Sequence, residues 1–232
     1  MRRFWKSVEI VEDAGGWCIH LDGKPLRTPA RAELAVPTSV LAEAIADEWR
    51  SAADQVDPGA MRMTGLANAA IDRIAPEMPA FAAGIARYAE ADLACYRSEW
   101  PPELVERQAA TWDPLLAWAR RRFDVDFSTT TSLMHVPQPV ATIERLAHTV
   151  AALNAYQLAG MSPLVTVGGS LVAALAVFER AITPAEGWLA VSVDDRWQLE
   201  QWGSDPDAEL AFDNHHSDFL AGARFLELLG ET

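Results

Sequence analysis

Short aromatic and β-branched runs alternate with turn residues at the start of the chain. Residues 4–11 and 17–21 both read as strands, and Gly15-Gly16 stands between them, so the pattern predicts an antiparallel hairpin. Asp22-Gly23 predicts a second tight turn. Short strands are expected to follow, and they fall at residues 24–28 and 33–36.

A helical pattern begins directly after these strands. Thr38-Ser39 is a typical helix cap, and residues 40–53 carry apolar side chains at helical spacing. Trp49 lies on the apolar side of this helix, where we expect a structural role in packing the helix onto the sheet. Residues 1–62 are therefore predicted to form a small antiparallel β-rich domain with one helix.

Apolar positions recur at the helical period through the rest of the chain, with short corners that contain proline. The pattern predicts an all-α orthogonal bundle over residues 63–232 and an α+β fold for the whole chain. Helices are expected over residues 64–74, 80–96, 103–123, 142–158, 164–178, 187–203 and 209–229. A turn is expected over 160–163, and the apolar helix that follows is predicted to lie buried at the centre.

The helix expected over 103–123 contains Trp112 on its apolar face, which predicts a structural role for this tryptophan. Pro114 interrupts the same pattern, because proline removes a backbone donor and clashes with the preceding turn. We therefore expect two helices or a kink near Pro114.

One carboxylate stands in an apolar stripe of the helix expected over 187–203. Trp188, Val191, Asp195, Leu199 and Trp202 share a face at the helical period. Burial of an unpaired charge is unfavourable, so Asp195 should have a polar partner or lie in a contact surface. The alternative is that the helix is half-exposed and Asp195 is an ordinary polar residue that interrupts its apolar stripe.

Neighbouring residues of this helix lie outside the apolar stripe. Helical phase predicts that Asp194 points outward and Asp195 inward, with Trp197 on the opposite flank. Trp202 belongs to the stripe and is expected to be structural.

Composition narrows the classes of partner. A net charge of −14 argues against nucleic acid and anionic membranes as partners, because both repel a net anion, and it favours partners with basic surfaces.

No apolar run is long enough to cross a bilayer. Cys18 and Cys95 lie far apart without CxxC spacing, which is typical of reduced thiols in a cytosolic core. The first residues have neither a signal-peptide nor a presequence pattern, and we expect the mature chain to begin at Met1.

Few residues are arranged for chemistry. Gly168-Gly169-Ser170 lacks a Walker lysine and Rossmann spacing, which favours close helix packing. His215-His216 point in different directions on a helix, so we expect no metal and no cofactor. A small-molecule hydrolase that uses Asp194 and Asp195 with a histidine remains the alternative to a binding protein.

Short motifs along the whole chain, taken in their order, resemble the ATP12-type assembly chaperones of the F-type ATP synthase. They comprise Arg3-Phe4-Trp5-Lys6, residues 21–29 (LDGKPLRTP), Glu48-Trp49, Asp92-Leu93, Tyr96-Arg97, Gln108, residues 112–115 (WDPL), Gly169-Ser170-Leu171, Gln198 and Trp202-Gly203. The last motif, which runs from the acids Asp194 and Asp195 through Gln198 to Trp202-Gly203, departs from the family at Arg196, where many members carry another acid.

The resemblance implies a function in binding rather than in catalysis. Such a chaperone holds the free α subunit of the catalytic sector and prevents its aggregation before the β subunit arrives. The resemblance gives functional weight to Trp49, Asp194 and Asp195, and we extend the expected partner-binding surface to Trp197 and Glu200. A monomer in a bacterial cytoplasm is expected.

Overall fold

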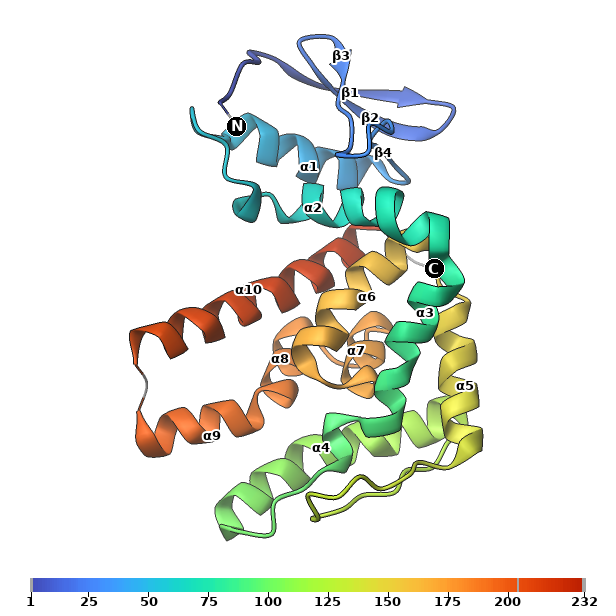
Figure 1. Ribbon diagram of the computed structural model, residues 1–232, viewed down its shortest axis with the longest axis vertical. Helices are drawn as coiled ribbons and strands as arrows, with labels where there is room; N and C mark the ends of the chain where they lie inside the picture. The colour runs from blue at the N-terminus through green and yellow to red at the C-terminus, as the bar shows by residue number, and fades with distance from the viewer. Residues whose placement is uncertain (1, 204, 231–232) are drawn as a thin grey trace. The chain divides into compact units, whose positions relative to one another are not determined.

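The computed structural model describes residues 2–203 and 205–230, which form two compact units (Figure 1). Unit 1 comprises residues 2–78, 154–160 and 224–230, and unit 2 comprises residues 79–153 and 161–223. The chain passes between the units four times: within α3, α6 and α10, and between residues 153 and 154 before α6. The expected division at residues 62 and 63 stays a prediction.

Unit 1 contains an antiparallel sheet in which β2 is the common partner. The strands are β1 (Val8–Asp13), β2 (Gly16–Leu21), β3 (Lys24–Pro25) and β4 (Ala35–Val36). β1 pairs with all of β2, whereas β3 and β4 pair with opposite ends of β2. The predicted hairpin is confirmed, since Asp13 pairs with Gly16 at the turn.

Helix α1 (Ser39–Ser51) packs on this sheet through its apolar face. Thr38 caps it as expected, with its side chain accepting a hydrogen bond from the Leu41 amide. Leu41, Ile45 and Trp49 of this face are buried and form part of the core of unit 1.

The other helices and turns of unit 1 follow α1 or come from later parts of the chain. α2 (Arg62–Ala69) continues into a π-helical turn (Ala70–Ile74), and 3₁₀ turns occupy Pro58–Ala60 and Ala75–Glu77. The first residues of α6 and the last residues of α10 also belong to this unit. Tyr156 Oη donates a hydrogen bond to the carbonyl oxygen of Ala35 at 2.5 Å.

Unit 2 consists of helices and the loops that join them. The helices that lie wholly or partly in it are α3 (Met78–Ala86), α4 (Pro102–Phe123), α5 (Val140–Ala151), α6 (Ala155–Gly168), α7 (Leu171–Phe178), α8 (Pro184–Val191), α9 (Val193–Trp202) and α10 (Pro206–Leu228). Further 3₁₀ turns occupy Arg87–Ala91 and Leu93–Cys95. The α+β fold class expected from the sequence is confirmed.

Helix α7 is the centre of unit 2. Its residues from Leu171 to Val177 are all buried, as an apolar sequence on every face requires. α4 and α8 pack against it, and Trp112 of α4 is 1% exposed with its Nε1 donating to the carbonyl of Ala190 at 2.7 Å.

Several expected helix boundaries are wrong. The helix expected over 80–96 ends at Ala86, and α6 runs through the expected turn at 160–163. The helix expected over 164–178 is divided at Gly169, whose φ of +65° ends α6 before Ser170 caps α7. The two-helix alternative for 103–123 is also wrong, because α4 continues through Pro114.

The single helix expected over 187–203 is divided as well. Ser192 lies between α8 and α9 and is fully buried, with φ −106° and ψ 16°. Its Oγ and its amide both donate to the Trp188 carbonyl, at 2.6 and 3.0 Å, so Ser192 closes the last turn of α8 at the point where the backbone leaves helical ψ. The division shifts the helical phase, so the predicted stripe from Trp188 to Trp202 does not form.

No helix among residues 2–203 and 205–230 is both long and apolar enough to cross a membrane.

Candidate partner-binding surface

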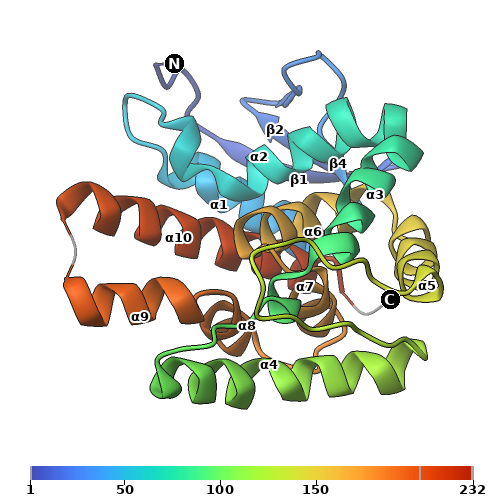
Figure 2. The ribbon, with the colours of Figure 1, turned by 60° about the horizontal axis from the view of Figure 1, so that its bottom comes forward.

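Asp194 lies in the first turn of α9, where an acid is favoured by the positive end of the helix dipole. Its Oδ1 accepts a hydrogen bond from Gln108 Nε2 at 2.7 Å. Gln108 is 1% exposed and lies on α4, which packs beside α9 (Figures 1 and 2). Asp194 is therefore half-buried and tied into unit 2.

Asp195 is on the exposed side of the same turn. Partial removal from water raises the pKa of its carboxyl, the charge of Asp194 raises that pKa further, and nearby His215 lowers it. The predicted orientation of the two acids is thus reversed. The reversal follows from the break at Ser192, because Asp194 and Asp195 belong to α9, which starts at Val193, and not to a helix that continues from residue 187.

Trp197 and Glu200 share one cation. The Arg107 guanidinium lies over the Trp197 ring at 4.8 Å, and Arg107 Nη1 forms an ion pair with Glu200 Oε2 at 2.6 Å. Trp197 is 9% exposed, so it forms the buried base of this cluster, whereas Glu200 is exposed. The expectation that Trp197 lies on an outward flank is corrected.

Trp202 is 77% exposed at the end of α9, which corrects the expectation that it packs in the interior. Trp188, its supposed neighbour on the stripe, instead packs against the rings of Phe212, His216 and Phe219. The break at Ser192 separates the two tryptophans into different helices.

Trp49 belongs to a buried cluster of unit 1. Its ring centre lies 4.8 Å from that of Trp5, and its Nε1 donates to Thr64 Oγ1 at 3.1 Å. The adjacent Glu48 accepts hydrogen bonds from the amides of Met63 and Thr64. This geometry supports a structural rather than a contact role for Trp49.

Sequence reasoning missed the buried acid Asp92. Its carboxylate accepts hydrogen bonds from Ser170 Oγ at 2.8 Å and from the amides of Ala94 and Val172, both at 3.0 Å. Burial raises the pKa of this carboxyl, and the bond from Val172 acts against that change. The Asp92-Leu93 motif and the cap residue Ser170 were visible in sequence, but their contact was not.

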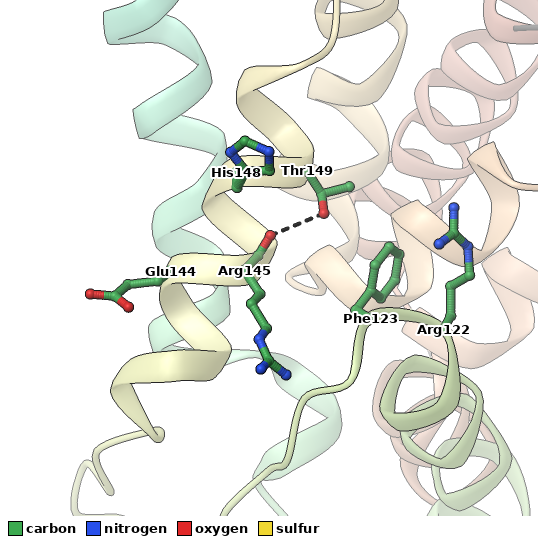
Figure 3. A pocket seen from close by; sticks show the side chains of 6 residues that line it. All are labelled: Arg122, Phe123, Glu144, Arg145, His148 and Thr149. Carbon is green, nitrogen blue, oxygen red and sulfur yellow. Dashed lines mark hydrogen bonds between the residues drawn. The ribbon is translucent and has the colours of Figure 1, made fainter.

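A shallow pocket lies between the end of α4 and helix α5 (Figure 3). It is lined by Arg122, Phe123, Glu144, Arg145, His148 and Thr149. Arg122 pairs with Glu179 and Arg145 pairs with Asp124, so both guanidinium charges already have partners. None of the predicted site residues lines this pocket.

Asp13, Cys18 and Glu33 bring their potential ligand atoms within 4.8 Å of one another. Burial, followed by the charge of Glu33, raises the pKa of the Cys18 thiol, which disfavours the thiolate that binds metals. We assign no metal to this group, and the expectation of no cofactor stays a prediction.

Unit 2 thus presents the acids of α9 and the exposed Trp202 on a packed helical scaffold. The family model for the ATP12 chaperone protein matches residues 2–120, more than half of the chain. The chain belongs to the ATP12 chaperone family.

Solved structures agree with this assignment. Atp12 of Paracoccus denitrificans is 38% identical with a TM-score of 0.93, and the match covers 98% of each chain. The Atu1473 protein of Agrobacterium tumefaciens is 36% identical with a TM-score of 0.93, covering 98% of this chain and 86% of that one. The mitochondrial protein atp12 of Schizosaccharomyces pombe is 26% identical over 219 residues, which are 89% of this chain and 75% of that protein.

Proposed function

We propose that this protein is an assembly chaperone that binds the free α subunit of the F-type ATP synthase catalytic sector and prevents its aggregation before pairing with the β subunit. The proposal rests on membership of the ATP12 chaperone family. The exposed acid Asp195 is the observation on this chain that supports a recognition surface.

The charge of the protein suits such a client. A net charge of −14, with Asp194 and Asp195 adjacent on α9, favours contact with a surface that carries basic groups. Exposed apolar side chains of the chaperone can cover the apolar surface of the client. If the apolar contact area is moderate, the chaperone can still release the client. A bacterial cytoplasm is proposed from the Paracoccus and Agrobacterium relatives, and a monomer remains our prediction.

A binding assay with the isolated client tests this proposal. Free α subunit diluted from denaturant should aggregate alone and stay in solution with the chaperone, as followed by light scattering. Added β subunit should compete for the client. Failure of both complex formation and aggregation suppression would overturn the proposal.

The hydrolase alternative has one observation in its favour, because His215 lies within electrostatic reach of Asp195. An acid–base pair still requires a cleft that places a substrate against both groups. The pocket on α4 and α5 contains neither residue. The family assignment supports a chaperone, and the absence of catalysis stays part of our proposal.

A further inference from the structure

Unit 2 exposes three large apolar side chains on two neighbouring segments. Trp100 is 77% exposed, Met134 is 75% exposed, and Leu133 is as exposed as in an extended chain. The segments are residues 95–100, which precede α4, and residues 129–137, which we call the apolar loop. The amide of Arg97 donates to the Thr130 carbonyl at 2.8 Å, and the amide of Thr130 donates to the Cys95 carbonyl at 2.9 Å. The two segments therefore lie side by side.

Polar side chains hold the apolar loop in place. Gln138, only 5% exposed, closes its base by donating to the Ser128 carbonyl at 2.9 Å and accepting from the Ser128 amide at 3.0 Å. Thr131 Oγ1 donates to Glu99 Oε1 at 2.7 Å. In Figures 1 and 2 the segment appears as an extended excursion from the end of α4 to the start of α5.

The apolar loop holds Leu133 and Met134 in water although hydrogen bonds fix its backbone. Apolar side chains held at a fixed position in water lack the favourable free energy that burial would supply. Exposed apolar clusters with a polar border are typical of protein contacts. The apolar loop has this character, since Glu99 borders it.

A second buried side chain, Gln108, connects the segment before α4 to the acidic pair of α9. Gln108 Oε1 accepts from the Ser98 amide at 2.8 Å, and Gln108 Nε2 donates to Asp194. Trp100 follows Ser98 by two residues, so one buried glutamine positions both the segment with Trp100 and the acid beside Asp195. Gln108 therefore connects the backbone beside Trp100 to the first turn of α9 within unit 2.

We propose that Trp100, Leu133 and Met134 form the apolar anchor of the client-binding surface, and that Asp194 and Asp195 form its acidic side. The occupant is an apolar segment of the free α subunit flanked by basic side chains, so this inference rests on the proposed function. The charge of the chain opposes nucleic acid and anionic lipid as occupants.

A double variant, Leu133→Ser with Met134→Ser, tests the anchor without touching the packed interior. Binding of fluorescently labelled free α subunit should weaken on the order of tenfold, as expected when anchor side chains are removed. The urea midpoint of the chaperone should not change. Phe4→Ser with Val40→Ser is the matched control, because these side chains are 70% and 57% exposed in unit 1.

The outcomes separate this inference from the proposed function. Unchanged client binding by the double variant, with tight binding by the wild type, overturns the anchor and leaves the chaperone function standing. Absence of binding by the wild type overturns both. A wild-type dimer in sedimentation that dissociates in the double variant, with client affinity unaffected, assigns the patch to self-association and overturns the anchor.

Discussion

Gln108 and Asp194 are 86 residues apart in sequence and are joined by a hydrogen bond of 2.7 Å. The same glutamine binds both the amide and the hydroxyl of Ser98. One buried amide side chain therefore connects α4, α9 and the segment that carries Trp100.

Replacement of Gln108 by alanine should destabilise the protein by about 1–3 kcal/mol, because the Ser98 amide and Asp194 lose their partner. Client binding should weaken as well, since two parts of the proposed surface lose their support. Urea unfolding and α-subunit binding measure the two effects. Gln198→Ala, at an exposed position of α9, is the control. Equal stabilities for the two variants would show that Gln108 does not hold the surface.

The two adjacent acids should respond differently to charge reversal. Asp195→Lys should weaken client binding and leave the urea midpoint unchanged, because Asp195 is exposed. Asp194→Lys should lower both binding and stability, because it places an ammonium against the Gln108 amide donor. Both quantities should be measured on each variant. A large stability loss in Asp195→Lys would identify that acid as a structural partner.

Trp49→Arg should destabilise unit 1 by about 3–5 kcal/mol or prevent folding, because it replaces a 7% exposed ring packed on Trp5 with a charge. Circular dichroism during thermal unfolding gives the measurement. Trp202→Arg is the matched control, since Trp202 is 77% exposed and its replacement should leave the melting temperature unchanged. An unaltered melting temperature in Trp49→Arg would contradict the packing argument.

Asp92→Asn keeps the shape of the side chain but turns one acceptor oxygen into a donor. Oδ1 and Oδ2 both accept hydrogen bonds in the interior, so the variant should leave a buried donor without a partner and lose about 1–3 kcal/mol. Chemical denaturation checks this value. Asp47→Asn on the exposed surface of α1 should have little effect by comparison. An unchanged free energy of unfolding in Asp92→Asn would mean that an amide can replace the carboxylate at the start of α7.

The two thiols should react slowly with Ellman's reagent in the native protein. Burial raises the pKa of Cys95 to about 12 and also raises that of Cys18, so little thiolate forms at pH 8. Both cysteines are buried and free, and both should react promptly in denaturant. Fast labelling of native Cys95 would contradict its position in the interior.

Local patterns in the sequence predicted the elements whose signals lie within a few residues. The glycine turn between β1 and β2, the Thr38 cap of α1 and the long helix α10 follow from backbone and capping preferences. The hydrophobic period also identified Trp49 and Trp112 as interior side chains. The ordered motifs were sufficient to indicate the family.

Tertiary structure decided the break at Ser192, and with it the orientation of Asp194 and Asp195. A period of 3.6 residues, counted along the sequence, continues through Ser192. In the fold the backbone of this buried residue leaves the helical conformation, at φ −106° and ψ 16°. The bonds of Gln108 to Asp194 and of Asp92 to Ser170 join residues 86 and 78 positions apart. Periodicity carries no information about such pairs, because they form only when packing brings distant segments together.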